Sequence, residues 1–474
     1  MGLGLVVRLV LARNFTTTQY GLYYLAMTVT NFVALISTLG LHLGATRQIA
    51  FARGINDTQS IKASVVASVI IAIGFGVIVA GITVGMAPII ANNIFGIPEV
   101  EPLIRILGVS IPFFSVITIL TSIYMGFEKV LPGVIFQHIL YNPLILLLLL
   151  PVVLLDLHFN NTAWSCTLSV VIGAIAFVRF FKVSPPINLS NTVGVSKALK
   201  VLLLMALPLF ALEVSDNIMI WADTLFIGSY MTAHDVGLYQ SAIPVARFIP
   251  IVLTLMYFVY VPLTTKLVAE NDIATLKMVH RAVTKWVSIV AIPLFLACML
   301  FPEIIIETLF GIEYIPATLS LQILSVGYLA LVILGPNGET IVALGNTKYL
   351  MISGLVFLGV NIGLNILLIP ILGINGAAIA TGVSRLGMAV TWAIKVFSGL
   401  HLNPYTWDYI RPTIIIIAII LLISQYIHSL FDIVLMLIAV VLIYIAISIV
   451  TNNTNDADKI IINKIKEIVQ KGGN

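Results

Sequence analysis

Charged residues are scarce in this chain. They make up 9% of its 474 residues, whereas hydrophobic residues make up 60%. A soluble globular domain carries about 25% charged residues, so this composition excludes a soluble fold and indicates an integral membrane protein. Cysteine is also rare: Cys166 and Cys298 both stand in apolar runs. We interpret them as small core residues and expect neither a disulfide nor a metal site.

Motifs of soluble enzymes are missing as well. The sequence has no phosphate loop, no HExxH, no Cys or His cluster at ligand spacing and no nucleophile elbow. We therefore expect that the chain is not an enzyme, uses no cofactor or metal, and has no nucleic-acid partner.

Long apolar runs are abundant. A membrane helix needs about 20 mostly apolar residues, and thirteen runs reach that length. Residues 1–11 are apolar but too short to cross, so we expect the chain to begin partway through its first helix. The predicted fold is all-α: a polytopic membrane protein with about 14 transmembrane helices, the first one truncated.

The two halves of the chain share short sequence motifs in the same order, about 219 residues apart. Offsets that drift by a few residues suggest short loop insertions between equivalent elements. This self-similarity predicts two six-helix lobes, as in alternating-access transporters. The matched segments are Gly126 and Lys129 with Gly345 and Lys348, Phe95–Ile97 with Phe310–Ile312, and Tyr20–Tyr23 with Val236–Tyr239. The predicted division is 1–182 for the first lobe, 183–198 for a cytoplasmic linker, 199–398 for the second lobe, 399–450 for two additional helices and 451–474 for a cytoplasmic amphipathic tail.

The placement of charge predicts the orientation. With both termini and every second loop in the cytoplasm, most of the 24 Lys and Arg fall inside, and only Arg13 and Arg105 fall outside. This is the asymmetry that the positive-inside rule describes. We expect a multi-pass protein of the cell membrane with both termini cytoplasmic.

A few ionisable residues remain inside the predicted spans. Such groups cost several kcal/mol in hydrocarbon unless they face a partner or a polar cavity. Two interpretations stay open: the acids pair with Arg8 and Arg247 as buried ion bridges, or the charges act in transport. Asp223 lies near the end of its span and could simply reach the membrane surface. The cations are Arg8, Arg247 and Arg385, and the carboxylates are Glu213, Asp216, Asp223 and Glu339.

Several stretches resemble the polysaccharide repeat-unit flippases of the multidrug/oligosaccharidyl-lipid/polysaccharide exporter superfamily. They are LVLARNFTTTQYGLYYLA, STLGLHLGATRQIA, ADTLFIGSYMTAHDVGLYQSA and VALGNTKYLMISGLVFLGVNIGLNILLIPILGINGAAIATGVS. The resemblance implies a transporter that flips a polyprenyl or dolichyl (pyro)phosphate-linked oligosaccharide outward by alternating access. It implies membrane lipids and glycan-biosynthesis proteins as partners. The three buried arginines would then bind the phosphate head group.

Three other functions compete with this one. The first is a cation-coupled multidrug exporter of the same superfamily, in which the carboxylates would bind H⁺ or Na⁺. The second is a membrane glycan polymerase or ligase, which the short outside loops disfavour. The third is a scaffold without transport, which the buried charges disfavour.

Overall fold

The protein, in a computed structural model that describes residues 2–405 and 407–450, is built almost entirely of helices. Apolar stretches of this length favour helices in lipid, where no water can satisfy the backbone and every N–H and C=O must bond within its own segment. The chain divides into two compact units, Met1–Gly237 and Leu238–Asn474. The predicted tail over 451–474 lies outside the described residues.

The first unit packs around α3, α4, α6, α9 and α10, which bury a shared apolar core. Its elements are α1 (Gly2–Asn14), α2 (Thr17–Thr38), α3 (Leu41–Gly54), α4 (Thr58–Ile89), η1 (Ile90–Phe95), η2 (Pro98–Val100), α5 (Glu101–Gly108), α6 (Ile111–Gly126), α7 (Val130–Val134), η3 (Ile135–Ile139), α8 (Tyr141–Leu154), α9 (Asn161–Val183) and α10 (Val195–Tyr230).

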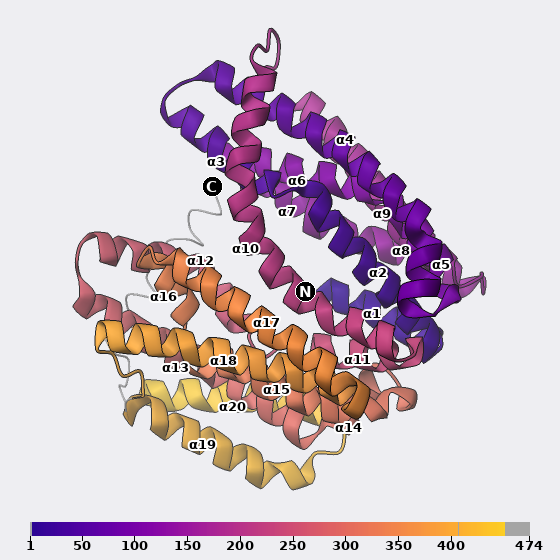
Figure 1. The fold of residues 1–474 in the computed structure, drawn as a ribbon. Helices are drawn as coiled ribbons and strands as arrows, with labels where there is room; N and C mark the ends of the chain where they lie inside the picture. Colours follow the sequence, from indigo (N-terminus) through magenta and orange to yellow (C-terminus); the bar gives the residue numbers. More distant parts are fainter. Residues whose placement is uncertain (1, 406, 451–474) are drawn as a thin grey trace. The chain divides into compact units, whose positions relative to one another are not determined.

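In the second unit, α18 lies beside both α15 and α17, and α13 packs against α15 and α19 (Figure 1). The helix α11 (Ala233–Ala246) begins in the first unit and ends in the second. The remaining elements are α12 (Ile251–Ala269), α13 (Ile273–Leu300), α14 (Pro302–Leu309), η4 (Ile312–Ala317), α15 (Thr318–Ile333), α16 (Asn337–Ala343), α17 (Thr347–Leu372), α18 (Ile374–Leu400), α19 (Trp407–Ile423), η5 (Ser424–Tyr426) and α20 (Leu430–Val450).

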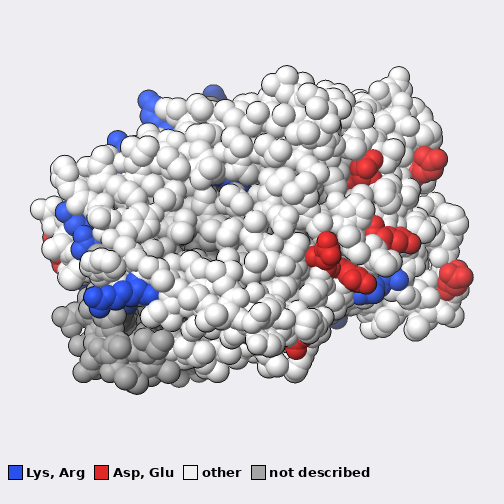
Figure 2. Space-filling view, turned by 90° about the horizontal axis from the view of Figure 1, so that it is seen from below, with Lys and Arg blue, Asp and Glu red and all other residues white. Residues whose placement is uncertain are grey.

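Nine helices in the described part of the chain are long and apolar enough to cross a membrane. The number rises to eleven when each of two bent helix pairs counts as one span. Large apolar side chains such as Leu154, Leu367 and Ile371 are exposed, and most of the surface in Figure 2 carries no charge. The all-α polytopic fold is therefore confirmed, while the count of about 14 spans stays a prediction.

Helix starts reveal the internal repeat in three dimensions. Thr16 and Gln19 form a capping box at the start of α2, and Thr232 and Asp235 exchange the same two bonds before α11. Such boxes satisfy backbone donors that the first helical turn leaves unpaired. The caps fall at the positions that the match of Tyr20–Tyr23 with Val236–Tyr239 predicts.

A second pair of equivalent starts involves Asp57 and Asp272. Asp57 accepts a bond from the Ser60 amide at the start of α4, and Asp272 accepts one from the Thr275 amide at the start of α13. The asparagine before each aspartate has a positive φ, 57° for Asn56 and 56° for Asn271.

One predicted equivalence is displaced. In the turns after α6 and α16, the left-handed residues are Glu128 (φ 62°) and Gly345 (φ 73°). The amides that follow bond back five residues in both turns, from Lys129 to Tyr124 and from Asn346 to Ile341. Glu128 therefore takes the structural place of Gly345, two residues from the predicted Gly126. The sequence match paired the two glycines, Gly126 and Gly345. In the first turn, however, the left-handed residue is Glu128, which is not a glycine.

Candidate functional site

Two of the three predicted arginines meet on one tyrosine in the second unit. The Arg247 Nε donates a hydrogen bond to the Tyr328 hydroxyl at 3.1 Å. The Arg385 guanidinium carbon lies 4.6 Å from the centroid of the same ring. The Nε of Arg385 is buried and has no hydrogen-bond partner in the described part of the chain. We call Arg247, Tyr328 and Arg385 the arginine–tyrosine cluster.

Close backbone packing fixes this geometry. A Cβ on Gly327 would lie 2.6 Å from the Gly382 Cα, so α15 and α18 touch at their backbones beside the cluster. Tyr328 follows Gly327 directly, and Arg385 lies almost one turn after Gly382. Arg247 lies between α11 and α12, at a bend of 55°. Arg247 therefore lies at a break between two helices, and its side chain reaches Tyr328 on α15.

The cluster holds positive charge that no described carboxylate compensates. In the described part of the chain, neither Arg247 nor Arg385 forms an ion pair with a carboxylate. The tyrosine supplies an acceptor oxygen and an electron-rich ring face, which stabilise guanidinium groups but do not neutralise them. The alternative in which acids pair with Arg247 is therefore not seen among the described side chains. The arrangement can attract an anion.

The predicted carboxylates do not join the cluster. Asp223 is 3% exposed on α10 in the first unit, so protein covers its side chain. Glu339 is half-buried on α16 of the second unit, next to the Thr340 hydroxyl that bonds Tyr260 at 2.7 Å. The side chains of Glu213 and Asp216 lie outside the described residues.

Arg8 belongs to a different environment. Its guanidinium carbon lies 4.3 Å from the centroid of the Tyr24 ring. Tyr24 in turn contacts the rings of Tyr20 and Tyr23, with centroids 4.7 and 5.2 Å away. Arg8 therefore rests on an aromatic cluster within the first unit, between α1 and α2.

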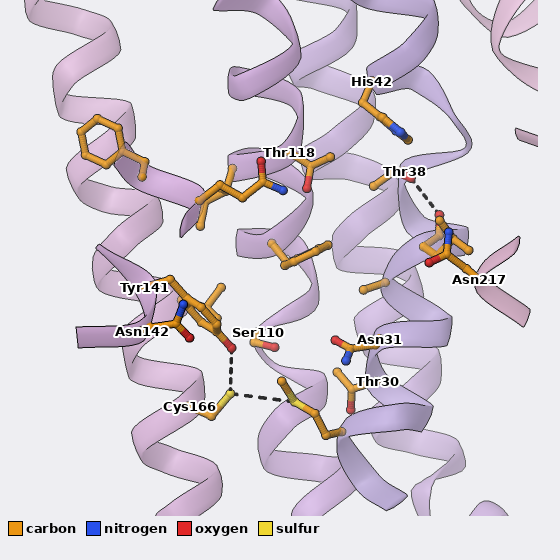
Figure 3. A pocket seen from close by; sticks show the side chains of 18 of the residues that line it. Thr30, Asn31, Thr38, His42, Ser110, Thr118, Tyr141, Asn142, Cys166 and Asn217 are labelled. Carbon is orange, nitrogen blue, oxygen red and sulfur yellow. Dashed lines mark hydrogen bonds between the residues drawn. The ribbon is translucent and has the colours of Figure 1, made fainter. Parts of the chain in front are cut away.

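Sequence reasoning missed a cavity of about 550 Å³ in the first unit. Side chains from α2, α6, α8, α9 and α10 converge on it (Figure 3). Cys166 borders it, with its Sγ 3.4 Å from the Tyr141 hydroxyl and 4.0 Å from the Met27 Sδ. The lining residues are Met27, Thr30, Asn31, Ala34, Leu35, Thr38, His42, Ser110, Phe114, Ile117, Thr118, Phe136, Gln137, Tyr141, Asn142, Cys166, Val170, Asn217 and Trp221.

The signal that could have revealed the cavity is the set of uncharged polar residues inside apolar spans. Thr30, Asn31 and Thr38 lie on α2, where a lipid-facing helix would carry aliphatic side chains. Of the predicted site residues whose side chains the structure describes, which are Arg8, Arg247, Arg385, Asp223 and Glu339, none lines the cavity. Within the described residues, no group of three or more His, Cys, Asp or Glu side chains could hold a metal ion.

Comparison with solved structures identifies the fold. A structure described as lipid II flippase MurJ in an inward closed conformation superposes with a TM-score of 0.74 at 16% identity, over 95% of this chain and 96% of that chain. An inward-facing multidrug resistance MATE family transporter of the MOP superfamily gives 0.68 at 16% identity, over 84% and 99%. A MOP superfamily transporter from Pyrococcus furiosus gives 0.60 at 15%, over 84% and 92%.

Sequence comparisons give the family. No curated protein sequence matches this chain. Residues 1–268 match the protein family described as "Polysaccharide biosynthesis protein". This match confirms the resemblance to the polysaccharide branch, and the fold is that of solved structures described as transporters or flippases. Because the match covers more than half of the 474 residues, the chain belongs to the polysaccharide biosynthesis protein family and has the fold of the MOP superfamily transporters.

Proposed function

We propose that this protein flips an oligosaccharide linked to a polyprenyl or dolichyl (pyro)phosphate from the cytoplasmic to the outer face of the cell membrane. The flipped glycan would serve polysaccharide or surface-glycan biosynthesis, with glycan-biosynthesis proteins as functional partners. Transport would proceed by alternating access in a chain of about 14 spans with both termini cytoplasmic. The polysaccharide biosynthesis family supports this proposal, as does a shared fold with a protein described as a lipid II flippase.

The arginine–tyrosine cluster is the observation that carries the proposal. A lipid-linked glycan brings a phosphate or diphosphate into the membrane, and that anion needs cationic partners when it leaves water. Arg247 and Arg385 provide two guanidinium groups with no described carboxylate partner, held by Tyr328. Guanidinium groups suit phosphate because their planar donors can bind two oxygens at once.

A cation-coupled drug exporter is the second candidate. Two carboxylates inside helices favour it: Asp223, which is 3% exposed, and Glu339, which is half-buried. In an exporter, one of these groups would bind H⁺ or Na⁺ and release it when the substrate moves. Several solved structures with this fold are described as multidrug transporters.

Transport in proteoliposomes distinguishes the two candidates. Purified protein would be assayed with a fluorescent lipid-linked oligosaccharide and, separately, with a cationic dye under an H⁺ or Na⁺ gradient. We expect movement of the lipid-linked oligosaccharide and no driven efflux of the dye. The reverse result would replace the flippase by the exporter.

Substitution of Arg247 tests the anion site itself. We expect Arg247→Ala to abolish flipping and Arg247→Lys to restore only part, since an ammonium group lacks the bidentate fork. Arg281→Ala is the matched control, because Arg281 bonds the Asn403 backbone carbonyl outside the cluster. If Arg247→Ala prevents folded protein from accumulating while Arg247→Lys keeps full flipping, Arg247 is a structural residue and not a head-group ligand.

A further inference from the structure

Several polar groups that line the cavity of the first unit have no hydrogen-bond partner among the described residues. The Oγ1 of Thr118 on α6 is buried and makes no hydrogen bond. The amides of Asn31 on α2 and Gln137 on η3 make no side-chain hydrogen bond within the described part of the chain. Buried polar groups are normally satisfied, and each exception needs an explanation. The Thr118 hydroxyl is such an exception, and the half-buried amides of Asn31 and Gln137 line the same space. The three groups together indicate a ligand with its own donors and acceptors.

Other lining hydroxyls can act only as acceptors. Thr30, Thr38 and Ser110 donate their hydroxyl hydrogens to carbonyls of their own helical segments, at 2.9, 2.8 and 2.6 Å. Their lone pairs remain available because a hydroxyl has one donor and two acceptor sites. A ligand that carries many O–H donors therefore finds acceptors on this wall of the cavity.

Among the side chains that the structure describes, the cavity lining contains no Asp, Glu, Lys or Arg. Its basic ring, His42, lies at one end of the cavity, away from Asn31 and Tyr141, which point toward one another across it (Figure 3). An acceptor-rich wall without cations would leave a carboxylate unpaired, and removing an unpaired charge from water is costly. The lining therefore favours an uncharged ligand.

We propose that this cavity binds an uncharged sugar of the transported glycan and discriminates against sugars that carry a carboxylate. The inference rests on the proposed flippase function and adds a selectivity to it. The volume of about 550 Å³ is within the range of small-molecule pockets. Trp221 and Tyr141 offer aromatic faces for the C–H face of a sugar ring, and the amides can donate to and accept from its hydroxyls.

A pair of probes that differ at one carbon tests the selectivity. Short-chain polyprenyl diphosphates carrying glucose or galactose would be compared with the same lipids carrying glucuronate or galacturonate, for binding to the full-length protein in nanodiscs. The lipid and the diphosphate are the same in both members of a pair, so the arginine–tyrosine cluster meets the same anion. We expect the neutral sugar of at least one pair to bind about tenfold tighter than its uronate, the ratio that one well-placed interaction gives.

Thr118→Val tests the cavity with little risk to folding, because valine keeps the shape and the lost hydroxyl has no protein partner. We expect it to weaken neutral-sugar binding about three- to tenfold and to leave binding of the uronate lipid unchanged. Thr121→Val is the matched control: its hydroxyl is also buried and unpartnered on α6 but does not line the cavity.

The outcomes separate this inference from the proposed function. Equal binding of neutral and uronate lipids, with no effect of Thr118→Val, would overturn the cavity assignment and leave the flippase intact. Failure of every lipid-linked sugar to bind, together with binding of a cationic dye that Thr118→Val weakens, would overturn both. Loss of binding in both Thr118→Val and Thr121→Val would show a packing effect and also reject the assignment.

Discussion

At the scale of the residue, Tyr328 is where the two arginines of the second unit meet, through its hydroxyl and through its ring. The two contacts can be removed separately. We expect Tyr328→Phe to lower flipping about three- to tenfold, because Arg247 loses its acceptor while the ring stays under Arg385. Tyr328→Leu should lower flipping further, since a cation–π contact contributes about 0.5–2 kcal/mol.

Tyr349 provides the matched control for this pair. Its hydroxyl also takes part in a hydrogen bond, here as the donor to the Thr391 carbonyl oxygen at 3.2 Å, and its ring lies beside a cation, with the Lys395 Nζ 5.3 Å from the ring centroid. Initial rates of lipid-linked oligosaccharide flipping would be compared at equal amounts of folded protein. Equal losses in Tyr328→Phe and Tyr349→Phe would refute a specific role for Tyr328.

Substitution of Glu339, a carboxylate that could bind a proton, distinguishes the flippase from the exporter. It is half-buried on α16 and forms no ion pair in the described part of the chain. In the flippase, Glu339→Gln should leave the flipping rate within about twofold, because an isosteric amide preserves packing and no partner charge is stranded. In an exporter it should end gradient-driven dye efflux. The two assays on one variant decide between these expectations.

At the scale of the element, helix contacts in the second unit depend on missing side chains. At Gly376 on α18, a Cβ would lie 2.4 Å from the Leu368 carbonyl oxygen of α17. At Gly327 a Cβ would lie 2.6 Å from the Gly382 Cα, and backbone cannot move aside cheaply. Small residues at such crossings let membrane helices pack closely.

We expect Gly327→Ala to destabilise the protein by about 1–3 kcal/mol, the usual cost of overpacking. It should also lower flipping, since it separates Tyr328 from Arg385. Gly363→Ala on α17 is the control, because a Cβ there meets no atom within 4 Å. Thermal unfolding in detergent would measure both. A melting temperature for Gly327→Ala equal to that of Gly363→Ala would contradict the proposed backbone contact.

The repeated caps at the starts of α4 and α13 predict a shared response to acid. The bond from the Ser60 amide lowers the pKa of Asp57, and bonds from Thr275 lower the pKa of Asp272. A lowered folded-state pKa means that the stabilisation is present above the unfolded pKa, about 3.9, and is lost as the pH falls through the lower folded value.

Hydrogen exchange would detect this loss at both helix starts. After correction for the intrinsic rate, protection of the first turns should hold at neutral pH and fall below about pH 4 at both positions. Asp57→Ala should remove the pH response at α4 and leave the response at α13. A response that persists at α4 in this variant would show that another group is responsible.

At the scale of the whole molecule, the sequence was sufficient to predict the class of fold. A long apolar run in lipid can satisfy its backbone hydrogen bonds within its own segment when it forms a helix. The sequence was also sufficient to single out Arg247 and Arg385, since charge is rare in such runs. It could not show that they share Tyr328, because the three residues lie on separate elements far apart in the chain. Nor could it show the cavity, whose polar lining is spread one or two residues at a time over several helices.

The orientation of the chain in the membrane is the remaining prediction, and it follows from the distribution of Lys and Arg. Each span reverses the side of the next loop, so one miscounted span would invert every loop after it. Reporter fusions in cells check the sides directly. We expect fusions after Glu101, Asp156 and Asp432 to report outside, and fusions after Lys62, Lys197 and Lys277 to report inside. Inverted signals at two consecutive sites would refute the predicted spans between them, whereas agreement at all six would support about 14 spans with both termini cytoplasmic.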